Sequence, residues 1–258
     1  MLKHFQVDEL DVYVHEDRER MGKAAAALGG EALRKIITEK GEVNVIFASS
    51  PSQDTLLEAL SKEPAIDWGR VNAFHMDEYI GVSENQPQSF ANYLKMDFFS
   101  KVKFKEVFYI NGMAENPESE CERYSDLIMK HPTDVAFLGI GENGHIAFND
   151  PHIANFFDPR LVIINDSLDE KCREQQVADG WFPSVADVPG SAITVSVYGL
   201  LKAAYVFTIV PGIRKSKIVK TCLEESIGNA CPSSGIRVHR NAKLFLDRDS
   251  ASLLSEGS

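Results

Sequence analysis

A single histidine within a glycine-rich turn is the feature of this sequence that most clearly points to chemistry. The residues concerned are Gly139, Gly141, Asn143, Gly144, His145 and Asp150. Glycines let a backbone come close to a ligand, so Gly141 and Gly144 are candidate ligand-binding positions. His145 is a candidate acid/base, Asp150 can fix its tautomer, and Asn143 can hydrogen-bond a ring nitrogen or a ligand. The alternative is a structural histidine with its hydrogen bonds satisfied in the core.

The apolar run over residues 134–140 predicts a buried strand that leads into this turn. Open α/β sheets bind their ligands at the carboxyl ends of parallel strands. The glycine spacing also matches a dinucleotide fingerprint, but the match lies mid-chain and continues into residues 146–151, which do not read as a helix. We therefore expect a small-molecule site without a nicotinamide or flavin cofactor.

Two adjacent acids, Asp77 and Glu78, follow the apolar run over residues 71–76. A carboxylate at the end of a strand is well placed to act as a general base beside a carbonyl carbon. The alternative is a solvated strand end or a helix cap. His75, within the run, is interpreted as structural.

A serine-rich turn joins the expected strand over residues 43–48 to the next expected helix. Its candidate ligand-binding residues are Ser49, Ser50, Ser52 and Gln53. Hydroxyls and free N–H groups at a helix start favour anions, although plain capping by a serine gives the same pattern. Lys215, at the start of a later helix, is a candidate cation, while the alternative is a solvated basic cluster with Arg214 and Lys217.

Helical and strand patterns alternate along the chain, which predicts an α/β protein: a three-layer, Rossmann-like fold with a mostly parallel sheet and helices on both faces. Expected strands cover residues 12–14, 43–48, 71–76, 107–110, 135–140, 161–164, 193–197, 204–210 and 242–246, and expected helices cover 18–39, 53–61, 88–99, 117–129 and 215–223. We expect one domain over residues 1–250, a lid within the irregular segment 166–190, and a loose tail over 251–258.

Composition narrows the class of protein further. The chain has 258 residues and a net charge of −11, so nucleic acid and anionic membranes are not expected partners. The four cysteines form no metal-binding or disulfide spacing, which favours reduced thiols in the cytoplasm. The first residues lack a signal-peptide core, and the apolar region 192–213 is interrupted by Lys202 and Pro211, so no membrane span is expected.

Taken together, these motifs resemble the glucosamine-6-phosphate deaminase/isomerase family, which is related to the 6-phosphogluconolactonases. The resemblance runs from about residue 12 to residue 247. Its most specific pieces are Phe74-x-Met76-Asp77-Glu78-Tyr79-x-Gly81 and Gly144-His145-Ile146-Ala147-Phe148-Asn149.

The resemblance implies a sugar-phosphate substrate and a reaction that needs neither a metal nor a redox cofactor. The family opens an amino-sugar phosphate, moves a proton between C1 and C2, and releases ammonia. Asp77 aligns with the base that moves the proton, and His145 aligns with the ring-opening acid/base. Asn143 and Asp150 align with two acids beside that histidine. The implied phosphate-binding residues are those of the turn 49–52 together with Lys215, and Glu78 is expected to shape the pocket.

Several positions depart from the family pattern. Asn143 stands where better-known members carry Asp, Asp150 stands where Glu is common, and Ser50-Pro51 replaces Gly-Gly in the phosphate turn. For the lid arginine that binds phosphate, Arg173 is the nearest counterpart, with Gln175 or Gln176 as substitutes. Some members are hexamers controlled by an effector. A homo-oligomer is therefore one expectation here, whereas Val162 replaces a basic effector-site residue and argues against that control.

Three alternatives to a glucosamine-6-phosphate deaminase remain open. A 6-phosphogluconolactonase would use the histidine to activate water, and it needs no base for a C2 proton. A deaminase or isomerase for another hexosamine phosphate fits the altered phosphate turn. A non-catalytic sugar-phosphate sensor fits the amide at Asn143, although the retained Asp77 and His145 favour catalysis.

Overall fold

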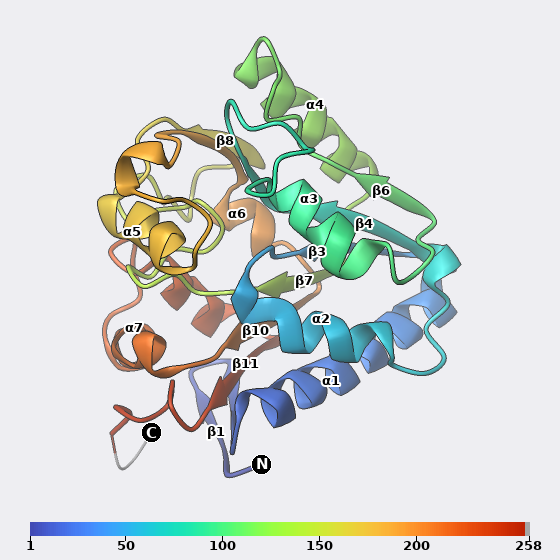
Figure 1. Cartoon of the computed structure of the whole chain (residues 1–258). Helices are drawn as coiled ribbons and strands as arrows, with labels where there is room; N and C mark the ends of the chain where they lie inside the picture. The colour runs from blue at the N-terminus through green and yellow to red at the C-terminus, as the bar shows by residue number, and fades with distance from the viewer. Residues whose placement is uncertain (256–258) are drawn as a thin grey trace.

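The computed structural model describes residues 1–255 and contains a large sheet between layers of helices. The strands of this sheet are β1 (Lys3–Val7), β2 (Leu10–His15), β3 (Val43–Phe47), β4 (Val71–His75), β6 (Glu106–Phe108), β7 (Val135–Leu138), β10 (Tyr205–Val210) and β11 (Ala242–Asp247). Their order is β1-β2-β11-β10-β7-β3-β4-β6, and every neighbouring pair is parallel except the β1–β2 hairpin (Figure 1). The predicted mostly parallel α/β fold is confirmed, while β1 was not predicted.

The α-helices are α1 (Arg18–Lys40), α2 (Asp54–Ser61), α3 (Phe90–Leu94), α4 (Pro117–Lys130), α5 (Glu170–Ala178), α6 (Val197–Leu200) and α7 (Ser216–Glu224). Shorter helical turns are η1 (Pro51–Gln53), η2 (Trp68–Arg70), η4 (Val185–Asp187), η5 (Ile213–Lys215) and η6 (Pro232–Val238), and η3 (Lys95–Phe99) is π-helical. Asp17 caps the first helix, because its carboxylate accepts a hydrogen bond from the Arg20 N–H. Gly41 ends that helix in the left-handed region, at φ 85°.

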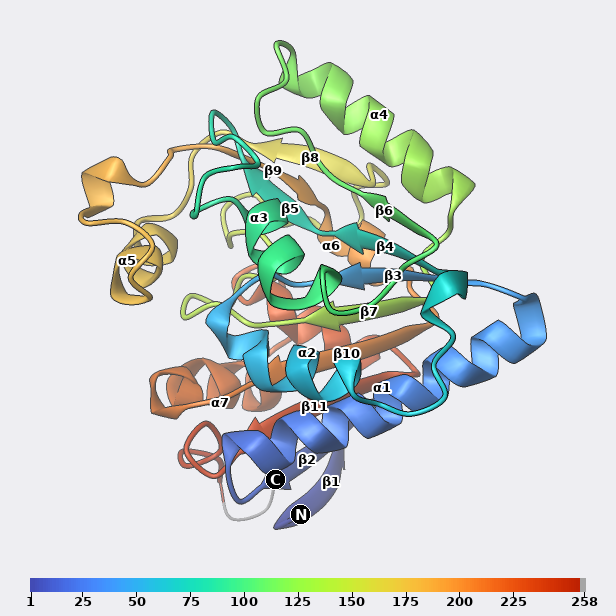
Figure 2. The same ribbon diagram turned by 45° about the vertical axis from the view of Figure 1, so that its right-hand side comes forward.

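Alternation along the central strands separates two apolar cores, one on each face of the sheet. In β7, Phe137 packs into the core beneath α1 and α2, whereas Leu138 packs into the core beneath α4, α6 and α7. Figure 2 shows α1, α2 and α3 together in front of the sheet. Because both faces are covered, the strands are apolar almost throughout, which is typical of parallel sheets.

A second, three-stranded antiparallel sheet carries part of the predicted site. It consists of β5 (Asp77–Tyr79), β9 (Ala192–Val195) and β8 (Val162–Asn165), in that order. Two runs expected as strands, 161–164 and 193–197, thus join this sheet and not the main one. The acids at 77 and 78 lie within β5 and do not merely end β4. Apolar residues of β9 share the core of the main sheet, which supports our proposal of one domain over residues 1–250.

The segment expected as an irregular lid contains the helix α5, which the sequence analysis missed. The described part of the expected loose tail, residues 251–255, also differs from the prediction. Ala251 and Leu254 pack against the core, and the Ser255 N–H donates to Glu224 at 2.8 Å. The remainder of that prediction, residues 256–258, lies outside the described residues. None of the helices in the described part of the chain is long and apolar enough to cross a membrane.

Candidate active site

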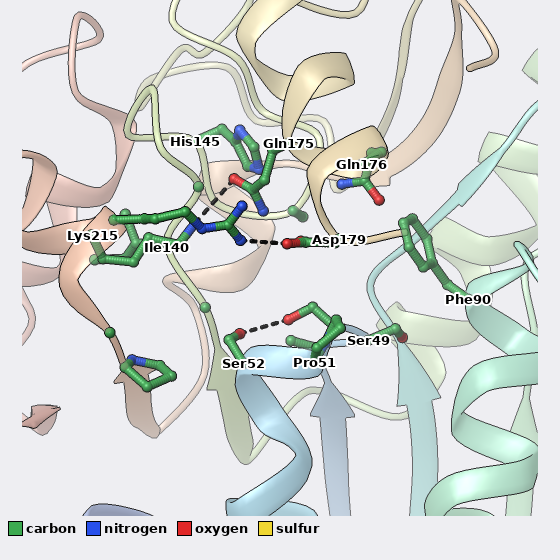
Figure 3. A pocket seen from close by; sticks show the side chains of 18 of the residues that line it. Ser49, Pro51, Ser52, Phe90, Ile140, His145, Gln175, Gln176, Asp179 and Lys215 are labelled. Carbon is green, nitrogen blue, oxygen red and sulfur yellow. Dashed lines mark hydrogen bonds and ion pairs between the residues drawn. The ribbon is translucent and has the colours of Figure 1, made fainter. Parts of the chain in front are cut away.

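A cavity of about 430 Å³ opens where the carboxyl ends of the parallel strands meet α5, the helix of the segment that we expect to form a lid. Among the residues predicted to act on or bind a ligand, those that line it are Ser49, Ser50, Ser52, Asp77, Gly141, His145, Gln175, Gln176 and Lys215. Figure 3 shows Gln175, Gln176 and Asp179 of the lid facing Pro51 and Ser52 across the opening. The turns that follow separate strands therefore converge on one space, as the fold class predicts.

His145 is held by an amide and not directly by a carboxylate. Its Nδ1 lies 2.6 Å from Oδ1 of Asn143, which also accepts the His145 backbone N–H at 3.1 Å. The Asn143 amide nitrogen donates to Oδ1 of Asp150 at 2.9 Å, whereas His145 Nδ1 is 3.5 Å from that same oxygen. Asn143 and Asp150 do not line the cavity but lie on the side of the imidazole away from it.

These contacts assign the tautomer of the imidazole. The Asn143 amide nitrogen has carboxylate acceptors, so its oxygen must face the ring, and Nδ1 must then carry the hydrogen. Burial lowers the pKa of His145 to about 4, against the opposing effect of Asp150, and Lys215 lowers it further. At neutral pH the imidazole is therefore neutral, and its Nε2 can accept a proton.

Gly141 makes room for this histidine. A Cβ at position 141 would lie 2.1 Å from a carbon of the His145 ring. The Gly141 N–H also donates to the His145 carbonyl at 2.9 Å, so the two residues close the turn on each other. Gly144 takes a positive φ of 91° and packs against Cys231, away from the cavity lining. The expectation that Gly144 contacts the ligand does not fit this placement.

Of the two adjacent acids, Asp77 lines the cavity and Glu78 does not. Asp77 is 7% exposed, and burial together with the neighbouring Glu78 raises its pKa well above the usual value, which makes it a stronger base. The carboxylate of Glu78 instead accepts from Ser89 Oγ at 2.7 Å and from the N–H groups at the start of α3. The predicted pocket-shaping role of Glu78 is therefore corrected to a structural one.

The serine turn and Lys215 form the end of the cavity that suits an anion. Ser50 Oγ and Ser52 Oγ lie 2.6 Å apart, and the buried Ser49 Oγ has no hydrogen-bond partner among the described residues. Lys215 Nζ donates to Gln175 Oε1 at 3.0 Å, and burial lowers the pKa of its ammonium to about 8. Gln53 lies behind this turn, where its amide donates to Ser52 Oγ, and does not line the cavity.

The arginine that the sequence analysis assigned to the lid does not reach the cleft. Arg173 donates to the carbonyl groups of Val185 and Val188 and so ties the lid to itself. The cavity is lined instead by Arg214, which pairs with Asp179 and Glu142. The sequence analysis named Arg214 only as a neighbour of Lys215, within the alternative of a solvated basic cluster, although its position beside Lys215 was a usable signal.

Arg18 is a second cation that the sequence analysis missed. It lines the cavity from the first turn of α1, and its nearest acid, Asp54, is 3.7 Å away. Two of its guanidinium nitrogens are buried without a hydrogen-bond partner in the described part of the chain. No local pattern marks this arginine, because the start of α1 reaches the cleft only through the strand order.

One group of side chains in residues 1–255 has the composition of a metal site. His145, Asp150 and Cys172 offer ligand atoms within 4.8 Å of one another. Both oxygens of Asp150 already accept hydrogen bonds, and His145 Nδ1 is bonded to Asn143. The two remaining donor atoms, His145 Nε2 and Cys172 Sγ, lie at hydrogen-bond distance from each other, 4.0 Å apart. Two ligands are fewer than zinc takes from protein, so the donor set does not fit a resident zinc ion.

The fold and the cleft together define an α/β protein with an acid/base site for a small anionic ligand. The family model for glucosamine-6-phosphate isomerases and 6-phosphogluconolactonase matches residues 16–245, and the chain belongs to this family. It is 33% identical over 225 residues to a glucosamine-6-phosphate deaminase of Listeria monocytogenes, covering 87% of this chain and 93% of that protein. A deaminase of the same name from Bacillus cytotoxicus is 28% identical over 247 residues, covering 96% and 90%.

Solved structures give the same result for the fold. A monomeric glucosamine-6-phosphate deaminase superposes with a TM-score of 0.85 at 27% identity, covering 94% of this chain and 99% of that chain. A 6-phosphogluconolactonase from Thermotoga maritima superposes with a TM-score of 0.75 at 21% identity, covering 92% and 98%. The second likeness concerns the fold alone.

Proposed function

We propose that this protein is a glucosamine-6-phosphate deaminase, which converts glucosamine 6-phosphate and water into fructose 6-phosphate and ammonia. The observation that carries the proposal is that Asp77, a buried base, lines the same cavity as His145 and the cationic, hydroxyl-rich end at Lys215. Family membership and the names of the relatives support the same activity.

The phosphate is held at the anion end of the cavity. Lys215 supplies a point charge, and the hydroxyls of Ser49, Ser50 and Ser52 supply hydrogen bonds. Pro51, whose ring leaves no N–H for the phosphate, is the first residue of η1. Serine hydroxyls therefore donate some of the hydrogen bonds to phosphate that backbone N–H groups donate in glycine-rich phosphate turns.

Ring opening is the step assigned to His145. Its free Nε2 takes the proton from the O1 hydroxyl of the cyclic sugar and delivers it to the ring oxygen, so that the C1–O5 bond breaks and the aldehyde forms. The resulting imidazolium is stabilised by Asp150 through Asn143, whose amide keeps Nδ1 protonated throughout.

Isomerisation is the step assigned to Asp77. Its carboxylate removes the proton from C2 and returns it to C1, while a second proton passes from the amino nitrogen to O1. This leaves a hydroxyl at C1 and an imine at C2. Water then adds to that carbon, and the amine departs as ammonia. The raised pKa of Asp77 matches this task, because a carboxylate in a dry site is a stronger base than one in water.

Ammonia release from a panel of 2-amino-2-deoxyhexose 6-phosphates, measured beside hydrolysis of 6-phosphogluconolactone, tests the proposal. We expect ammonia from glucosamine 6-phosphate, the matching amount of fructose 6-phosphate, and no lactone hydrolysis above background. Lactone hydrolysis without ammonia would replace the proposal by the lactonase alternative. Ammonia from galactosamine 6-phosphate alone would show that this ester, and not glucosamine 6-phosphate, is the substrate. Tight binding of a hexosamine 6-phosphate without turnover would indicate a sensor.

We also propose that the protein forms a homo-oligomer. One glucosamine-6-phosphate deaminase of the same fold is described as monomeric, so light scattering on the purified protein is the test. The four cysteines of the described chain are buried free thiols, which is consistent with the cytoplasmic location that we expect.

A further inference from the structure

Every hydrogen-bond donor and acceptor of the Asn143 side chain has a partner, so its neighbours must offer donors to its oxygen and acceptors to its nitrogen. Its oxygen accepts two hydrogen bonds from His145, and its nitrogen donates to Asp150 Oδ1 at 2.9 Å and to Asp169 Oδ1 at 3.0 Å. An asparagine offers two acceptor lone pairs and two donors, so none is left over. The amide therefore stands between the histidine and two carboxylates.

An aspartate in place of Asn143 would conflict with this arrangement. Its second oxygen would face Asp150 and Asp169 at the distances where the amide nitrogen now donates. Like charges at such a distance repel strongly in a buried site. The amide at 143 and the acid at 169 are thus complementary, and the negative charge lies one hydrogen bond further from the imidazole.

Asp169 also belongs to the lid. It is the N-cap of α5, where Oδ1 accepts the Lys171 N–H at 3.0 Å, and its own N–H donates to Asp150 Oδ2 at 3.0 Å. The same helix carries Cys172, which packs against His145 Nε2, and Gln175, which binds Lys215. The seating of α5 and the environment of the histidine are therefore linked through one carboxylate.

We propose that Asp169 is a positioning residue for His145: through Asn143 it supplies the negative charge that supports the imidazolium, and it ties that support to the seating of the lid helix α5. This deepens the proposed function and rests on the role of His145 in it. The charged groups that act on the ring are the two carboxylates, which favour its protonation, and Lys215, which opposes it. Removing the charge of Asp169 therefore lowers the pKa of His145.

The test uses Asp169→Asn, because asparagine caps a helix about as well as aspartate and can still accept from Asn143. We expect the His145 pKa, followed by NMR of ¹⁵N-histidine-labelled protein without substrate, to fall. We also expect kcat/KM for ammonia release to drop roughly tenfold, within the range of coupling energies of residues in one network, while KM changes little. Asp17→Asn, the same change at the cap of α1, is the control and leaves both values unchanged.

Two further variants, which move a negative charge from position 169 to position 143, distinguish this positioning role of Asp169 from its role as a helix cap. Asn143→Asp alone should be nearly inactive, because three carboxylates then meet. Asn143→Asp combined with Asp169→Asn should recover at least tenfold relative to that single variant, since one carboxylate and one amide have exchanged places. An unchanged His145 pKa in Asp169→Asn, or a double variant no better than Asn143→Asp, overturns the proposal. The NMR comparison decides the role of Asp169 even if the wild-type protein releases no ammonia.

Discussion

Lys215 Nζ lies 3.0 Å from Gln175 Oε1, so the residue that precedes α7 is bonded to the lid helix α5 across the mouth of the cleft. The same Gln175 oxygen accepts the Glu142 N–H at 3.0 Å. The lid is thus bonded to the cation proposed for phosphate binding and also to the histidine turn. A phosphate that binds Lys215 competes with an internal hydrogen bond and not with bulk water alone.

The protonation of Lys215 predicts how affinity depends on pH. Because the pKa of Lys215 is about 8, its side chain is charged below that pH and loses its charge as the pH rises through it. The Kd of a polyol 6-phosphate without an amino group should therefore increase above pH 8, as measured by calorimetry. In Lys215→Arg the increase should vanish, because a guanidinium stays charged. A Kd that does not change with pH in the wild-type protein would contradict this role.

In Lys215→Met we expect KM to rise about 10–100-fold with kcat nearly unchanged, because one charge-assisted hydrogen bond to the phosphate is lost.

Asp77→Asn separates chemistry from binding. The amide keeps the size of the side chain but cannot accept the C2 proton, so kcat should fall by about 10²–10⁴-fold. The Kd of the polyol phosphate should remain within a few-fold of wild type, because the anion end of the cavity is untouched. Exchange of the C2 hydrogen with deuterated solvent, measured by NMR, should disappear in parallel. A variant that keeps normal turnover would remove Asp77 from the mechanism.

Much of the site could be predicted because each part follows its own buried strand. Asp77, His145 and Lys215 lie far apart in the sequence, and the rule that parallel strands expose their carboxyl ends at one edge brings them together. The identity of the phosphate-side arginine could not be predicted this way. Whether Arg173 or Arg214 faces the cleft depends on the orientation of a short helical segment, which neither residue type nor spacing determines.

The helix α5 was not predicted because its sequence, like the choice between the two arginines, gives no local signal. The buried residues of α5 are Cys172 and Gln176, and Cys172 belongs to an apolar cluster against which Val177 also packs. So few apolar positions give no helical hydrophobic period, because another part of the helix faces the cleft through Gln175 and Gln176. Glu78, by contrast, could have been placed. Successive residues of a strand point to opposite sides, so Asp77 in the cleft implies Glu78 outside it.

Gly141→Ala should damage catalysis by displacing the histidine. The added methyl group would lie 2.1 Å from a carbon of the His145 ring, so the ring or the turn must move. A misplacement of about 1 Å can cost about 10²-fold in rate, and we expect a loss of that order in kcat with the melting temperature lowered by only a few degrees. Gly228→Ala is the control, since a Cβ there meets nothing within 4 Å. Wild-type kcat in Gly141→Ala would show that the turn absorbs the methyl group.

Glu78→Ala should lower the stability of the fold more than it affects catalysis. Glu78 is 1% exposed, and its carboxylate accepts from Ser89 Oγ and from the backbone N–H groups of Tyr79, Phe90 and Ala91. Removing it leaves buried donors unsatisfied at the start of α3, which costs about 2–3 kcal/mol. In a chain of this size that corresponds to a melting temperature lower by roughly 5–10 °C in calorimetry. The exposed Glu84, on the loop after β5, is the control, and Glu84→Ala should melt as the wild type does. If Glu78→Ala instead kept its melting temperature and lost substrate affinity, Glu78 would belong to the binding site after all.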